Sequence, residues 1–211
     1  MRKNYLLHIL SLAFVLLINT SCNDQKKKEA EAPAAADTSS HPGWSAQTNI
    51  YEVNLRQFSK AGTIMAFEKD LPRLKEMGVE VLWFMPITPI GLEGRKMTEA
   101  DMGSYYAVKD YKAFNPEFGT MDNWKAFVKH AHNMGFKVIT DWVANHSAPD
   151  NPWIKTHPQF YEKDSTGKFA FSFDWSDTRN LDYSNRELRD SMTAAMKYWL
   201  TETGIDGFRC D

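Results

Sequence analysis

Two short segments of the chain combine side chains that could do chemistry at the end of a β-strand. Residues 205–211 read IDGFRCD, which places Arg209 and Asp211 two residues apart. Side chains alternate across a strand, so these two are expected to point to the same side. A guanidinium lowers the pKa of a neighbouring carboxylate and keeps it ionised, as a carboxylate nucleophile requires. The open alternative is an ion pair with a purely structural role.

The second segment, DWVANHS at residues 141–147, supplies Asp141, Asn145 and His146. It follows a run of apolar residues that predicts a buried strand. If this strand is parallel to the one that carries Arg209, both sets of polar side chains lie at the same edge of a sheet.

The elements that must position these residues follow from hydrophobic periodicity. Nearly continuous apolar runs predict strands at residues 50–55, 79–87, 136–143 and 205–211. Apolar residues spaced by three and four predict helices between them, over residues 64–77, 124–134 and 188–199. Glycines at positions 78, 135 and 204 are expected to end these helices, and Thr120 is expected to cap the second.

This β-α-β-α-β-α-β order predicts parallel strands, because crossover connections are right-handed. A doubly wound sheet and a (β/α)8 TIM barrel both fit. The barrel is favoured because no glycine-rich phosphate loop follows the first strand and because the polar residues sit at strand carboxyl ends. Since a full barrel takes about 250 residues, we expect only its first four β/α units here. An inserted loop subdomain is expected after the third strand, at about residues 147–184.

The amino-terminal part has a different composition. A basic start, an apolar run and the sequence NTSC ending at Cys22 predict an export signal over residues 1–22. Small residues before a cysteine are typical of bacterial lipoproteins, so Cys22 is the expected lipidation site; a plain signal peptide is the alternative. Residues 23–45 are polar and rich in Ala and Pro, which predicts a flexible linker to a folded part at residues 46–211.

Composition limits the classes of partner. The formal net charge is -2, and aromatic residues make up 13% of the chain. This near-neutral balance gives no basic excess for nucleic acid, and none is expected as a partner. The expected partners are a substrate and, through the lipid anchor, a membrane.

Several segments together resemble the α-amylase family, glycoside hydrolase family 13. They are, in chain order, IYEVNLRQFS, GVEVLWFMPITP, GSYYAVKDYKAFNPEFGT, DWVANHS and GFRCD. The resemblance covers essentially the whole predicted folded part. It implies a retaining glycoside hydrolase that acts on α-glucans such as starch or maltooligosaccharides.

The resemblance also implies roles for individual residues. Asp211 matches the catalytic nucleophile, and Arg209 holds it ionised and oriented. Among the substrate-binding residues, His146 hydrogen-bonds the sugar before the cleaved bond and Tyr106 stacks on it. Asp141 is grouped with them and supports the strand ends near the arginine.

Other features of the family are expected outside these segments. Its acid/base glutamate lies on a fifth strand, so we expect a chain truncated before that residue and inactive by itself. Asn145 matches an asparagine that often ligates calcium, with Asn180 where the family has an aspartate, so Ca²⁺ is the one cofactor expected and no organic cofactor is. The open alternative is that Asn145 only hydrogen-bonds the inserted segment.

Three alternatives to an α-glucan hydrolase stay open. Within the family they are an α-1,6-acting enzyme and a transglycosylase, and outside catalysis a glycan-binding relative. In each case the predicted location is the bacterial cell envelope, as an outer-membrane lipoprotein or in the periplasm.

Overall fold

The computed structural model describes residues 41–96 and 102–211. The chain divides into two compact units, Met1–Ala46 and Gln47–Asp211. The described part of the first unit contains a 3-10 turn, η1 (Gly43–Ser45). The predicted signal peptide with Cys22 and most of the predicted linker lie outside the described residues. In the two described ranges, no helix has both the length and the hydropathy needed to span a bilayer.

The second unit is built on a parallel sheet with strand order β1-β2-β3-β6. This order confirms the four predicted strands and their parallel pairing. The first strand ends at Val53, two residues earlier than predicted, because Asn54 caps a short helix by accepting a hydrogen bond from the backbone N–H of Gln57. The strands are β1 (Ile50–Val53), β2 (Val81–Phe84), β3 (Lys137–Trp142) and β6 (Gly207–Cys210), and the short helix is α2 (Leu55–Phe58).

The first predicted helix is divided in two. The structure has α3 (Ile64–Glu68) and α4 (Leu71–Glu76) where one apolar stripe predicted a single helix. Pro72 explains the division, because a proline lacks the backbone N–H that a helix interior needs but fits the first turn of α4. Hydrophobic periodicity alone does not reveal this break, because the buried residues keep their spacing of three and four from α3 into α4.

The cap and the terminal glycine predicted for the two longer helices are found, although both helices begin before the first residue of the predicted apolar stripe. Helix α5 (Met121–Asn133) opens with a capping box, in which Thr120 accepts from the backbone of Asn123 and the Asn123 side chain accepts in return. Helix α7 (Arg186–Thr203) ends at Gly204, whose φ of +76° is the left-handed conformation that favours glycine.

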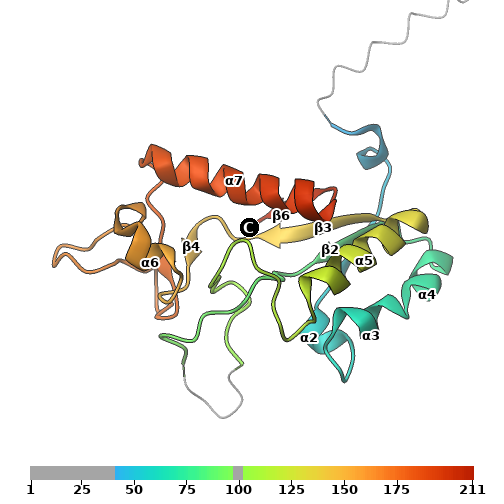
Figure 1. Cartoon of the computed structure of the whole chain (residues 1–211), viewed down its shortest axis with the longest axis horizontal. Helices are drawn as coiled ribbons and strands as arrows, with labels where there is room; N and C mark the ends of the chain where they lie inside the picture. Colours follow the sequence, from blue (N-terminus) through green and yellow to red (C-terminus); the bar gives the residue numbers. More distant parts are fainter. Residues whose placement is uncertain (1–40, 97–101) are drawn as a thin grey trace, which may run out of the picture. The chain divides into compact units, whose positions relative to one another are not determined.

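The sheet has two chemically different sides. Leu82, Phe84, Val138 and Trp142 lie in the main hydrophobic core on one side. Phe84 makes edge-on contacts there with Trp124 of α5, with ring centroids 5.1 Å apart. In Figure 1, α3, α4 and α5 lie together beside β2, and α7 runs along β3 and β6. The helices therefore cover the apolar side and leave the alternate side chains of each strand for the site.

The segment between β3 and α7 lies beyond the carboxyl end of β3, as Figure 1 shows. Its strands β4 and β5 form a small antiparallel ladder. Phe160, Tyr161 and Leu181 from this segment are buried in the same core as the helices. A separate inserted subdomain is thus not confirmed. The elements of the segment are β4 (His146–Ser147), α6 (Trp153–Thr156), η2 (Pro158–Phe160) and β5 (Arg179–Asn180).

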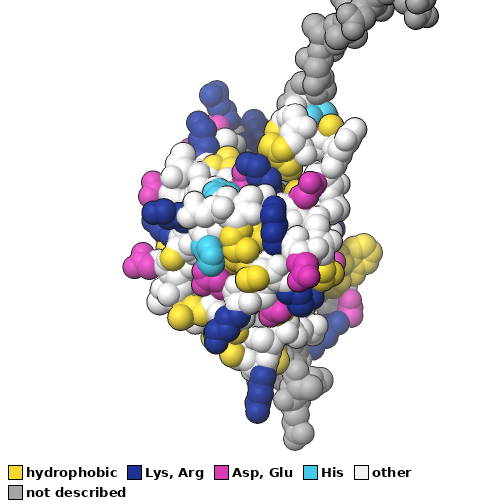
Figure 2. Space-filling model, turned by 90° about the vertical axis from the view of Figure 1, so that its right-hand side faces the viewer, with side chains coloured by type: hydrophobic (Ala, Val, Ile, Leu, Met, Phe, Trp, Pro, Cys, Tyr) yellow, Lys and Arg dark blue, Asp and Glu magenta, His cyan; other side chains and the backbone are white. Residues whose placement is uncertain are grey.

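Charges on the surface are mixed. On the face drawn in Figure 2, basic and acidic side chains are intermingled and not gathered by sign. Two histidines that contact carboxylates illustrate the pattern: His130 pairs with Glu68, and His132 pairs with Asp206, at 2.6 and 2.7 Å.

Candidate active site

The carboxyl ends of β3 and β6 bring three charged side chains together. Asp141 and Arg209 are register partners on the two neighbouring strands. Nη1 of Arg209 donates to Oδ2 of Asp141 at 3.0 Å and to Oδ1 of Asp211 at 2.6 Å. One guanidinium nitrogen therefore bridges two carboxylates, and Arg209 and Asp211 share a side as strand alternation predicted.

Asp141 is the most enclosed member of this group. Its side chain is 0% exposed, whereas that of Arg209 is 39% exposed. Burial raises the pKa of Asp141 above its ordinary value, and the charge and hydrogen bonds of Arg209 only partly offset this. Because Asp141 is covered and bound to the arginine, the structure favours the supporting role over direct contact with a substrate.

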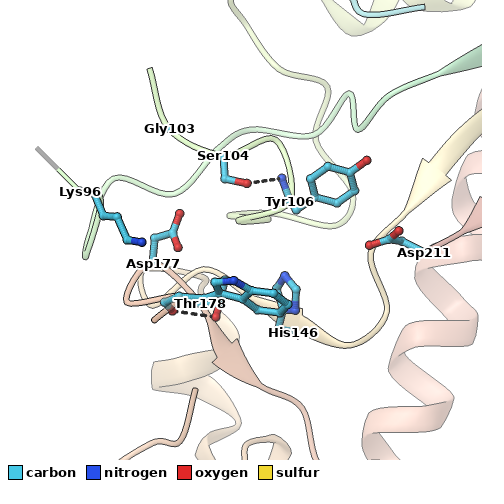
Figure 3. A pocket seen from close by; sticks show the side chains of 9 residues that line it. Lys96, Gly103, Ser104, Tyr106, His146, Asp177, Thr178 and Asp211 are labelled. Atoms are coloured by element: carbon cyan, nitrogen blue, oxygen red, sulfur yellow. Dashed lines mark hydrogen bonds between the residues drawn. The ribbon is translucent and has the colours of Figure 1, made fainter. Parts of the chain in front are cut away.

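A pocket of about 550 Å³ opens beside Asp211. This volume is in the range of small-molecule sites. Figure 3 shows Tyr106 entering the pocket from a loop and His146 from the start of β4, with Asp211 reaching it from the end of β6. Three of the residues expected to act on a sugar thus line one cavity. The remaining lining residues are Lys96, Gly103, Ser104, Trp175, Asp177 and Thr178.

His146 is held in the pocket wall by its backbone and by burial. It begins β4, its backbone O accepts a hydrogen bond from the hydroxyl of Tyr111 at 2.8 Å, and the residue is 6% exposed. Burial lowers the pKa of His146 below 6.5, although the charges of Asp177 and Asp211 oppose the shift. The imidazole is therefore uncharged at neutral pH and can both donate to and accept from a hydroxyl group.

Tyr106 lies on a loop that Arg56 of helix α2 holds in place. Arg56 donates to the backbone O of Gly103 at 3.2 Å, and its guanidinium lies 4.3 Å from the ring centre of Tyr105. The N–H of Tyr106 donates to Oγ of Ser104 at 3.2 Å, a contact drawn in Figure 3. Burial raises the pKa of the Tyr106 hydroxyl, and the nearby charges of Asp141 and Asp211 add to the rise. The phenol is therefore neutral and offers an apolar ring face to the cavity.

Sequence reasoning missed the residues that two loops contribute to the pocket. Trp175, Asp177 and Thr178 come from the segment between β3 and α7, and Lys96 comes from the loop after β2. The length of the first segment predicted an insert after the third strand. No spacing pattern identified which of its side chains would face the cavity.

The expected calcium ligand, Asn145, lies beside His146 at the start of β4. The exposed side chain of Asn145 lies 3.1 Å from Nδ1 of His146. Asn180 pairs in register with His146, and its amide already donates to Glu162 and accepts from Ser172. Among the residues that the structure describes, no three His, Cys, Asp or Glu side chains gather as a metal site. Calcium at Asn145 stays a prediction.

Helices on one side of a parallel sheet and a polar pocket at its carboxyl edge define a barrel-type catalytic domain. Comparison with known proteins gives the particular family. Residues 45–165 match the alpha amylase catalytic domain. The chain belongs to the α-amylase family.

Three relatives illustrate the likeness. Alpha-amylase 3 of Dictyoglomus thermophilum is 28% identical over 196 residues, which cover 80% of this chain and 37% of that protein. Oligo-1,6-glucosidase of Parageobacillus thermoglucosidasius is 27% identical over 205 residues, with 80% of this chain and 35% of the relative covered. The crystal structure of an alpha-amylase from Lactobacillus plantarum superimposes with a TM-score of 0.73 at 41% identity, over 78% of this chain and 38% of that one. The chain thus spans little more than a third of the length of these relatives.

Proposed function

We propose that the full-length gene product is a retaining glycoside hydrolase that acts on α-glucans such as starch or maltooligosaccharides. One observation carries this proposal: Arg209 contacts Asp211 at 2.6 Å, and Asp211 lines a pocket together with His146 and Tyr106. Family membership and the names of the relatives agree with it.

In this mechanism a carboxylate oxygen of Asp211 attacks the anomeric carbon of the bound sugar. The glycosidic bond breaks, and a covalent glycosyl-enzyme ester forms. Arg209 holds the carboxylate of Asp211 in position through its hydrogen bond, while Asp141 holds the arginine through a second one. The neutral His146 exchanges hydrogen bonds with sugar hydroxyls, and the ring of Tyr106 packs against the apolar face of the sugar.

A second carboxyl group must protonate the leaving oxygen, and in retaining enzymes it lies about 5–5.5 Å from the nucleophile. By the family resemblance this group is a glutamate on a fifth strand of the parallel sheet. The sheet in the described residues contains four strands.

The direct test is to follow the cleavage of maltopentaose by the full-length gene product with ¹H NMR. The α-anomer should appear first, and Asp211→Asn should lower kcat at least a thousandfold while the unfolding curve is unchanged. Initial release of the β-anomer, or activity retained in Asp211→Asn, would refute the assignment.

An α-1,6-acting enzyme is the second candidate, and the similarity to an oligo-1,6-glucosidase favours it. Isomaltose and maltose distinguish the two linkages, because each offers only one. A transglycosylating enzyme would instead convert maltotriose into longer chains as fast as it releases glucose.

Two further proposals concern the envelope location and the metal. We propose that Cys22 is acylated and anchors an exported protein to the cell envelope. Mass spectrometry of the amino-terminal peptide tests this, and Cys22→Ser should release the protein from membranes.

We propose that Asn145 supplies one oxygen to a structural Ca²⁺. The melting temperature with and without EDTA, in the wild type and in Asn145→Ala, tests this.

A further inference from the structure

Three aromatic side chains stand at alternate positions in the loop that precedes β5. Phe171, Phe173 and Trp175 are 45%, 83% and 40% exposed. Single exposed apolar side chains are common and need no explanation. Three within five residues beside a pocket are different, because two of them join a continuous row of rings.

This row leads from the surface into the pocket. The ring of Phe173 lies 4.9 Å from that of Trp175, and Trp175 lies 5.6 Å from the ring of His146. Exposure falls along the row, from 83% at Phe173 to 40% at Trp175 and 6% at His146. Because Trp175 also lines the pocket that contains Asp211, the row extends the cavity outward.

The backbone of Phe173 is in an unfavourable conformation. Its φ is +52°, and among the described residues it is the one non-glycine residue with a positive φ. The turn closes with a hydrogen bond from the N–H of Trp175 to the backbone O of Ser172 at 3.1 Å. Such turns usually place glycine or asparagine where Phe173 stands. A bulky ring that is both strained and exposed indicates a functional constraint on the side chain.

The segment beneath Trp175 is firmly held. The backbone O of Trp175 accepts from both the N–H and the hydroxyl of Thr178, at 3.0 and 2.9 Å. The hydroxyl of Ser176 donates to the backbone O of Gly94 at 2.8 Å. The row of rings is therefore set in place before a ligand arrives, which lowers the entropy lost on binding.

We propose that Phe173 and Trp175 form a stacking platform for a glucosyl unit next to the one held at Asp211. The proposal rests on the proposed function and extends it to the length of the substrate. A pyranose ring presents C–H groups of slight positive charge on its faces, and these match the negative face of an aromatic ring. Asp177 and Thr178, which line the same cavity, offer oxygens to the sugar hydroxyls. The site thus selects chains of glucose over a single glucose.

Two substrates of different length test the platform in the full-length gene product. Maltopentaose reaches past the cleavage site, whereas 4-nitrophenyl α-glucoside fills little more than that site. We expect Trp175→Ala to lower kcat/KM for maltopentaose about tenfold and Phe173→Ala to lower it several-fold. For the short substrate the loss should be at least five times smaller.

Phe171→Ala is the matched control. Phe171 is an exposed aromatic of the same loop, but its ring lies 5.4 Å from the guanidinium of Arg179 and it does not line the pocket. Its removal should change kcat/KM for maltopentaose less than twofold. Equal losses on both substrates, or no loss on maltopentaose in the Trp175 and Phe173 variants, would overturn the platform.

Binding separates failure of the platform from failure of the proposed function. Maltopentaose is titrated calorimetrically into the Asp211→Asn protein, with and without Phe173→Ala. Weaker binding in the double variant supports the platform even if no enzyme form turns over. Unchanged binding in the double variant, or no binding in either protein, overturns it.

Discussion

Replacing Asp141 by asparagine should impair catalysis without lowering stability at neutral pH. The carboxylate is 0% exposed, and its partner Arg209 is 39% exposed. Removing a carboxylate from water costs several kcal/mol, whereas a partly solvated ion pair returns only about 1 kcal/mol. Asparagine keeps the shape of the side chain and avoids the cost, so we expect a gain of about 1 kcal/mol at pH 7.

The pH dependence fixes the sign of this effect. Burial raises the folded-state pKa of Asp141 above the unfolded value of 3.8. Between pH 3.8 and the folded-state pKa, the folded wild type holds a proton on Asp141 that the unfolded chain has lost. The free energy of unfolding therefore falls as pH rises through this range. The Asn variant lacks this loss, so the two proteins should be alike near pH 4 and diverge in favour of the variant at higher pH.

Asp206→Asn is the matched control at the opposite end of the sheet. Although burial opposes it, hydrogen bonds from Lys137, the N–H of Val138 and His132 lower the pKa of Asp206. Its contribution is present above pH 3.8 and is lost as pH falls through the folded pKa. The same substitution should therefore cost about 2 kcal/mol at pH 7.

Urea unfolding of the full-length gene product between pH 4 and 8 measures both effects, and kcat/KM on maltopentaose measures the catalytic one. We expect Asp141→Asn to lower kcat/KM between tenfold and a hundredfold. The reason is that Arg209 loses one of the two carboxylates that hold its guanidinium in place, so it positions Asp211 less well. The reasoning is refuted if Asp141→Asn becomes steadily less stable than the wild type as pH rises.

Three other predictions concern the pocket wall, the loop contact and a helix cap. His146→Gln should lower kcat/KM at least tenfold; because burial lowers the pKa of His146, the wild type should also lose melting temperature relative to this variant as pH falls below 6.5. Gly94→Ala would place a Cβ 2.3 Å from the backbone O of Ser176 at a φ of +77°, so it should cost about 3 kcal/mol, whereas Gly167→Ala, with a φ of +83° and open space, should cost about 1 kcal/mol in urea unfolding. Thr120→Ala removes the capping box of α5 and should cost about 1 kcal/mol, and an unchanged urea midpoint would show that the cap is dispensable.

The sequence predicted the elements that depend on local pattern. Strands buried on both sides are largely apolar, so β2 appeared as the continuous apolar run VLWF. The apolar residues of KVITDW likewise indicated β3, although this strand also carries the polar residues of the site. Helix ends depend on single residues, and Gly204 and Thr120 marked them correctly. The common side of Arg209 and Asp211 followed from strand alternation alone.

What the sequence did not predict depends on contacts between distant segments. Trp175 lines the pocket, and its neighbour Ser176 donates a hydrogen bond to Gly94, more than eighty residues away along the chain. The raised pKa of Asp141 depends on how deeply it is buried, and the expected effect of an arginine on a carboxylate points in the opposite direction. Local sequence patterns therefore predicted the helices, the strands and the polar residues at the carboxyl edge of the sheet. The other residues that line the cavity depend on tertiary packing.

The central claim is that Asp211 is the nucleophile, and covalent trapping tests it most directly. The full-length gene product is incubated with 5-fluoro-α-glucosyl fluoride, digested, and analysed by tandem mass spectrometry. The account predicts inactivation with one fluoroglucosyl group on Asp211 and none in the Asp211→Asn protein. A label on any other carboxylate of an active enzyme would contradict it.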